Sequence, residues 1–113
     1  MATWRDPKYL LDMLLAARDA QDVVAHLSRE AFEQNRTAQP AAAHALQIIG
    51  EAANRVSQAT RDLHPEIPWR QMIGMRNRLV HDYGHIDQAI VWSTLQAHLP
   101  SLIATLESLV PPE

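Results

Sequence analysis

The chain contains no cysteine, which excludes disulfide bridges, thiolate zinc sites and cysteine nucleophiles and is ordinary for a protein of the reducing cytoplasm. It has only three glycines and few segments in which β-branched and polar residues alternate, so the pattern of a β-sheet is lacking. A net charge of −3 gives none of the overall positive field that general nucleic-acid binders carry. Any phosphate binding must therefore be local.

The N-terminal segment lacks the features of an export signal or a membrane span. Arg5, Asp6 and Lys8 interrupt it early, and the longest apolar run nearby, residues 13–17, is far too short for either. Of the 113 residues, 47% are hydrophobic, which is enough for one packed core, while the chain is short for two domains. We therefore expect a single domain over residues 1–113, located in the cytoplasm and without membrane contact.

The apolar residues of the first half recur at helical spacing. Asp6 is placed to cap a first helix, with Pro7 in its first turn, and the apolar periodicity continues to about Leu27. The polar residues 28–37 predict a connection that contains about one helical turn. Pro40 is tolerable in the opening turn of a second helix, whose apolar and polar residues separate onto two faces.

The second half predicts two more helices. Two prolines within residues 64–68 forbid a regular helix there, and a third helix begins at the second of these prolines or at the next residue. Gly84 is placed to end that helix, and Asp87 to cap a fourth, whose apolar stripe stays in phase across a kink at Pro100. Amphipathic helices joined by short connections predict an all-α, up-and-down bundle of four to five helices.

An arginine stands in the apolar stripe of the third helix. At about 100° per residue, Arg76 falls in the middle of that stripe, although arginine is rarely buried without a partner. A second stripe, a quarter turn or more away, contains Arg70, Asn77 and His81. Arg78 adds a third arginine, and no acidic residue interrupts this stretch, which therefore suits phosphate. The apolar stripe consists of Trp69, Met72, Ile73, Arg76, Leu79, Val80 and Tyr83.

Residues 76–83, Arg-Asn-Arg-Leu-Val-His-Asp-Tyr, resemble the motif of HepT toxins, in which four residues separate an arginine from a histidine and a tyrosine follows two positions later. Three further blocks resemble the same family in the same order, at residues 48–52, 65–69 and 90–92. The resemblance covers most of residues 46–102. HepT proteins belong to the HEPN superfamily.

This resemblance implies a HEPN-like helical bundle that works as a homodimer and cuts RNA without a metal or other cofactor. It implies the toxin of a type II/VII-like toxin–antitoxin pair, with Arg76 and His81 as the catalytic residues of an endoribonuclease. Four further residues would support the site or contact the RNA, namely Asn77, Arg70, Arg78 and Glu51.

The implied chemistry suits the residue types. Cleaving RNA without a metal requires a base for the 2′-hydroxyl proton, an acid for the leaving 5′-oxygen and positive charge at the phosphorus. Histidine suits the proton steps, and the planar fork of arginine suits a pair of phosphate oxygens. One histidine cannot conveniently be acid and base at once, whereas a two-fold dimer supplies two copies of His81 and Arg76. Since one straight helix points Arg76 and His81 in different directions, the site needs either unwinding near His81 or a second protomer.

The resemblance also implies a way to switch the toxin off. In HepT-like proteins the tyrosine of the motif, here Tyr83, receives AMP from an MntA-like nucleotidyltransferase antitoxin. A bulky nucleotide with added negative charge beside Arg76 and His81 would occupy the phosphate site and repel RNA.

Two other functions stay open. A catalytically silent HEPN subunit would bind a nucleotidyltransferase without cutting RNA. A plain structural bundle would need Arg76 only as a buried ion pair with Glu51, His81 as a helix C-terminal cap and Tyr83 as a core residue. Gly74 would let another backbone approach, from a dimer partner or from RNA. The other histidines have no metal-ligand spacing beyond chance, so no metal site is assigned.

Overall fold

The computed structural model describes residues 3–82 and 84–111, and this part of the chain contains helices and no strand. The predicted all-α class is therefore confirmed. The elements are the 3-10 helix Thr3–Arg5 and the α-helices α1 (Asp6–Val24), α2 (Arg29–Gln34), α3 (Ala38–Arg55), α4 (Gln58–Leu63), α5 (Trp69–His81) and α6 (Gln88–Leu109).

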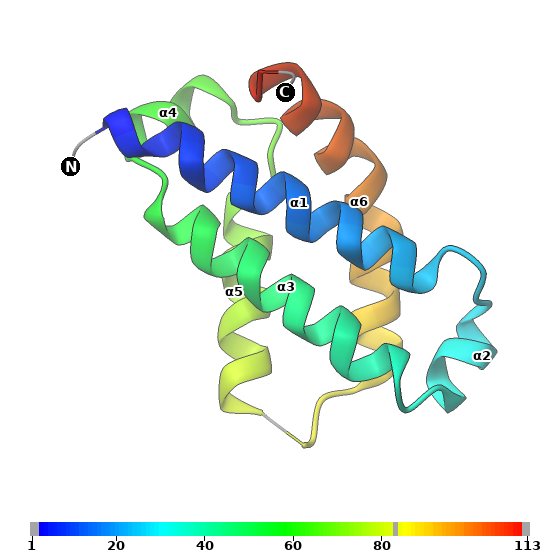
Figure 1. The fold of residues 1–113 in the computed structure, drawn as a ribbon. Coiled ribbons are helices and arrows are strands. Elements are labelled where there is room, and N and C mark those ends of the chain that lie inside the picture. Colours follow the sequence, from blue (N-terminus) through cyan, green and yellow to red (C-terminus); the bar gives the residue numbers. More distant parts are fainter. Residues whose placement is uncertain (1–2, 83, 112–113) are drawn as a thin grey trace.

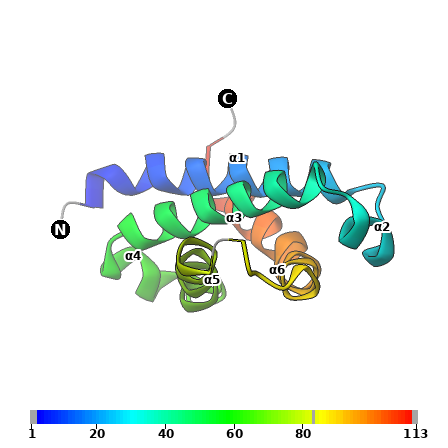
Figure 2. The ribbon, with the colours of Figure 1, turned by 90° about the horizontal axis from the view of Figure 1, so that it is seen from below.

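The four long helices form two layers. Helices α1 and α3 lie side by side in one layer, and α5 and α6 lie against it in the other and cross it steeply (Figures 1 and 2). The short helices α2 and α4 stand at opposite ends of the molecule (Figure 1). Helix α5 packs mainly on α3, so that most of its remaining surface is open.

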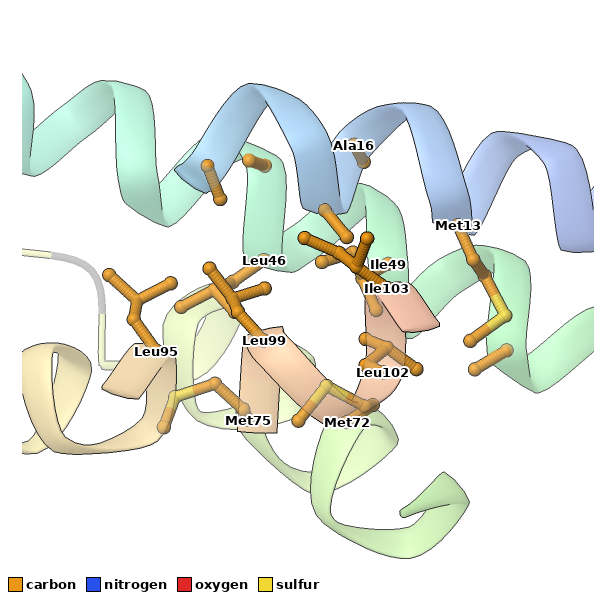
Figure 3. Packing of buried hydrophobic residues seen from close by; sticks show 14 of the residues in the cluster. Met13, Ala16, Leu46, Ile49, Met72, Met75, Leu95, Leu99, Leu102 and Ile103 are labelled. Carbon is orange, nitrogen blue, oxygen red and sulfur yellow. The ribbon is translucent and has the colours of Figure 1, made fainter. Parts of the chain in front are cut away.

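A single apolar core lies between the two layers. Its central side chains come from all four long helices, and methionines of α1 and α5 fill the space between the branched residues of α3 and α6 (Figure 3). The buried residues of this core include Met13, Ala16, Leu46, Ile49, Met72, Met75, Leu95, Leu99, Leu102 and Ile103 (Figure 3).

Helix α6 is long and apolar enough, by length and composition alone, to cross a membrane. The bundle accounts for this character, because the apolar stripe from Val91 to Leu106 is buried in the core. As predicted, one long helix runs through Pro100, and the Asp87 side chain caps it by accepting a hydrogen bond from the Ala89 N–H at 2.8 Å.

The predicted capping role of Asp6 is wrong. The N-cap position of α1 is Arg5, and Asp6 is already the first helical residue. The residue is only 3% exposed. Its carboxylate accepts hydrogen bonds from the Ser57 N–H at 3.0 Å, the Ser57 hydroxyl at 2.6 Å and the Thr60 hydroxyl at 2.6 Å. Asp6 therefore joins the beginning of α1 to the beginning of α4.

Helix α4 is missing from the sequence-based prediction. Helix α3 ends because Val56 adopts an extended conformation, with φ −66° and ψ 137°, and Ser57 then caps α4 by accepting from the Thr60 N–H at 3.3 Å. Neither glycine nor proline marks this break in the sequence. The contact that stabilises it comes from Asp6, 51 positions away.

Candidate active site

Helix α5 presents a narrow apolar seam to α3. The buried side chains of this seam are Trp69, Met72, Met75 and Leu79. The predicted stripe was too wide, because Val80 is 45% exposed, and it omitted the buried Met75. One main neighbour covers only a narrow strip of a helix, which is why the outer apolar positions of α5 stay near solvent.

Close contact between α3 and α5 depends on Gly50. A Cβ atom at this position would collide with the Cβ of Arg76 and lie 2.6 Å from the carbonyl oxygen of Met72. Only glycine lets the two backbones approach in this way, and the approach holds the stem of Arg76 against α3. Gly50 lies within the block 48–52 of the family resemblance, but the sequence analysis assigned it no role.

Arg76 lies at the edge of this helix contact. Its guanidinium donates from Nη1 to Asn77 Oδ1 at 3.1 Å and from Nη2 to Glu51 Oε1 at 3.3 Å. The Arg76 side chain is 33% exposed and that of Glu51 55% exposed, so the pair is at the surface. The structural-bundle alternative requires a pair sealed in the core, which this is not. Arg76 Nε is buried and has no acceptor among the described residues.

His81 lies on a different side of the same helix. Helix α5 stays helical as far as His81, so five residues of rotation separate the directions of Arg76 and His81 by about 140°. Asn77 is one turn before His81 and holds Arg76, and both Asn77 and His81 are exposed. Among the described residues, the His81 side chain has no hydrogen-bond or ion-pair partner. One protomer therefore does not bring Arg76 and His81 onto the same side of α5.

The remaining predicted residues spread over α5. Arg70 is exposed and lines an open hollow of about 710 Å³ together with Arg61, and eleven residues of helix, about 16 Å, separate it from His81. Arg78 is exposed on the side away from Arg76. The Cβ position of Gly74 has empty space around it. Tyr83 lies outside the described residues.

No group of three or more histidine and acidic side chains within residues 3–82 and 84–111 is arranged to hold a metal ion. Among the described residues, the side chains that accept hydrogen bonds from Arg76 are those of Glu51, a carboxylate, and Asn77, an amide. The arrangement presents a guanidinium held by two side chains on one side of α5 and an exposed imidazole on another side.

The chain is similar to known proteins over nearly its whole length. The family model described as ribonuclease HepT-like matches residues 13–109. The "Probable ribonuclease HepT" of Thermococcus cleftensis is 37% identical over 101 residues, which cover 89% of this chain and 92% of the relative. Two relatives from Methanocaldococcus jannaschii, both named as candidate RNases, are 33% and 30% identical over 91% and 94% of this chain, and over 95% and 88% of their own lengths. No solved structure matches the chain.

Proposed function

Because the chain belongs to the HepT-like ribonuclease family, we propose that it is a metal-independent endoribonuclease with Arg76 and His81 as its catalytic residues. The observation that carries this proposal is the position of Arg76, whose guanidinium is held at the surface by Asn77, while His81 is exposed on another side of the same helix. An arginine held in this way on an open helix is suited to receive a phosphate of RNA.

The phosphate would bind the donors of Arg76 that the protein leaves free. A guanidinium has five N–H donors. The described contacts use one for Asn77 and one for Glu51, and Nε is buried, which leaves one N–H on each of Nη1 and Nη2 for a phosphate. An exposed ion pair contributes only about 0–1 kcal/mol, so a phosphate can displace the Glu51 carboxylate at little cost. Glu51 would then act as a placeholder that orients Arg76 before RNA binds.

A second protomer would complete the site. The conformation of α5 gives no support to unwinding before His81, which leaves a homodimer as the arrangement that brings Arg76 and His81 onto one phosphate. One His81 would take the proton of the 2′-hydroxyl as its oxygen attacks phosphorus, and the other would protonate the leaving 5′-oxygen. Arg76 would stabilise the added negative charge. The products would be a 2′,3′-cyclic phosphate and a 5′-hydroxyl.

We further propose that the chain is the cytoplasmic toxin of a toxin–antitoxin pair. Its antitoxin would be an MntA-like nucleotidyltransferase that adenylylates Tyr83, two positions after His81 in the sequence. The added AMP would bring bulk and negative charge close in sequence to the catalytic histidine and so oppose RNA binding.

A catalytically silent HEPN subunit is the second candidate. The Arg76–Glu51 pair favours it, because a paired arginine is partly neutralised before any phosphate arrives. Such a subunit would bind the nucleotidyltransferase and leave RNA intact.

RNA cleavage in excess chelator separates the two candidates. We expect the wild-type protein to cut RNA under these conditions and His81→Ala to lower the rate by about 10²–10⁴-fold, the usual contribution of general acid–base catalysis. His26→Ala, an exposed histidine between α1 and α2, is the matched control and should cut at the wild-type rate. Intact RNA with the wild type, or equal cutting by His81→Ala, would contradict the nuclease proposal.

A further inference from the structure

A hollow of about 670 Å³ opens beside the proposed active site. The first half of α3, the end of α5 and the connection that leads into α6 form its walls. Its volume lies within the range of roughly 300–1,000 Å³ that small-molecule sites occupy. It is therefore large enough for one nucleotide.

The hollow begins one helical turn from the Arg76–Glu51 pair. Leu79 lines it and follows Arg76 by three residues on α5, and Gln47 lines it and precedes Glu51 by four residues on α3. One turn of helix is about 5.4 Å. An RNA strand with its phosphate at Arg76 would thus place a neighbouring nucleotide in the hollow.

The lining has the groups that recognise a nucleobase. Amides of Gln39, Gln47 and Gln88 each offer both donors and acceptors, as the edge of a base requires. Apolar side chains, among them the exposed Pro40 and the partly exposed Ile86, can cover the flat face of a base. Arg36, also in the lining, can bind a flanking phosphate.

The side-chain amides of Gln39 and Gln88 differ in the hydrogen bonds that they make within the protein. Gln39 Nε2 donates to the Phe32 carbonyl at 2.9 Å, so this amide is fixed in direction. Gln88 Oε1 is buried and has no hydrogen-bond donor among the described residues. Rotation of the Gln88 side chain into the hollow would let this oxygen accept from a base N–H, which gives the ligand an interaction that the protein alone lacks.

We propose that this hollow binds the base of the nucleotide next to the scissile phosphate and thereby influences which RNA sequences are cut. The proposal rests on the ribonuclease function proposed above. A free nucleotide carries the same base as an RNA strand, so the test has to distinguish binding of RNA from binding of a free nucleotide.

A large side chain placed in the hollow tests the proposal, because it should change the rate and the base preference of RNA cleavage. Ala43 lines the hollow, whereas Ala41 is exposed on the same helix outside it. In an RNA that contains every dinucleotide step, we expect the wild type to prefer certain bases beside the cut. Ala43→Trp should lower kcat/KM about tenfold or more and flatten that preference, and Ala41→Trp should change neither. Gln47→Leu retains the size of the side chain and should also flatten the preference, so a folding defect of Ala43→Trp does not decide the result.

Backbone amide chemical shifts give a measurement independent of cleavage. The probe is a short oligonucleotide with 2′-O-methyl groups, which cannot be cut because its 2′-oxygens cannot attack. We expect it to shift the amides of Ala43, Gln47 and Gln88, with AMP alone shifting them far less at equal concentration. Equal shifts with AMP would assign the hollow to free nucleotides and overturn the RNA subsite.

The outcomes separate the two proposals. RNA left intact by the wild type contradicts the ribonuclease and the subsite together. Normal cleavage with an unchanged base preference in Ala43→Trp and Gln47→Leu, and no shifts around the hollow, contradicts only the base subsite.

Discussion

The Arg76 guanidinium is held at the edge of the contact between α3 and α5 by hydrogen bonds to Asn77 and Glu51. The helical projection places an arginine in an apolar stripe, and the structure places its stem against Gly50 while its charged end reaches the edge of the contact. The position of Arg76 could be predicted from the periodicity alone. The sequence analysis also named Glu51 as a partner, but in a buried pair. The contact with Gly50 and the surface position of the pair could not be predicted, because they depend on the close approach of α3 and α5.

Asp6 is the residue with the clearest effect on stability. Burial raises the pKa of its carboxyl, but hydrogen bonds from Ser57 and Thr60, aided by the charge of Arg61, outweigh burial and hold the pKa below its ordinary value. A carboxyl whose pKa is lowered by folding adds stability above its unfolded-state pKa of about 3.9. That contribution is lost as the pH falls below this value.

Asp6→Asn should therefore lower the free energy of unfolding at pH 7 by about 1.5–3 kcal/mol, the usual value of hydrogen bonds to a charged group. Urea denaturation followed by circular dichroism measures this difference. The gap between the wild type and Asp6→Asn should narrow as the pH falls through about 4 and below. Asp22→Asn, at an exposed position of α1, should have little effect, and a gap that stays constant with pH would contradict the role of Asp6.

At the scale of helices, capping residues and prolines in the sequence predicted where helices begin when neighbouring residues alone determine that point. Asp87 caps α6 as expected, and α5 begins directly after the prolines. Helix α4 could not be predicted, because the contact that stabilises its beginning is the distant carboxylate of Asp6. The exposure of Val80 could not be predicted either, since it depends on how many helices cover α5.

The two glycines that flank the α5 site should respond oppositely to alanine. Gly50→Ala forces α3 and α5 apart, so we expect it to lower the free energy of unfolding by about 1–3 kcal/mol and to slow RNA cleavage by displacing Arg76. Gly74→Ala enters empty space within a helix and should raise the free energy of unfolding by up to about 1 kcal/mol.

Urea denaturation of both glycine variants, together with their cleavage rates, checks this pair. Equal stability of Gly50→Ala and the wild type would mean that α3 and α5 do not need glycine between them. The close approach at Gly50 would then not be what holds the stem of Arg76 against α3.

At the scale of the whole molecule, the proposed site would need a second protomer. Figure 2 shows α5 at the side of the bundle away from α1. The sequence resemblance indicated Arg76, Asn77 and His81, and the structure leaves Asn77 and His81 exposed and Arg76 partly exposed on α5. Neither specifies the surface of the second protomer, because the pattern of one chain does not contain the geometry of a two-fold contact.

The proposed antitoxin would act on the protein by modifying Tyr83. After incubation with its nucleotidyltransferase and ATP, the protein should gain the mass of at least one AMP on Tyr83 and lose RNA cleavage. Peptide mass spectrometry locates the modification, and Tyr83→Phe should neither gain AMP nor lose activity. AMP found at another residue, or cleavage that persists after modification of Tyr83, would contradict the proposed switch.

Mixed dimers test most directly the central claim, that two copies of His81 cut RNA together. Wild-type and His81→Ala protein are mixed in equal amounts, unfolded in urea and refolded together, and the cleavage rate is compared with that of the wild type at the same total concentration. Random pairing leaves about a quarter of the dimers with two intact copies. If both copies of His81 are needed, the mixture should cut RNA at about a quarter of the wild-type rate. A rate of about half would contradict the claim, because each protomer would then be cutting RNA alone.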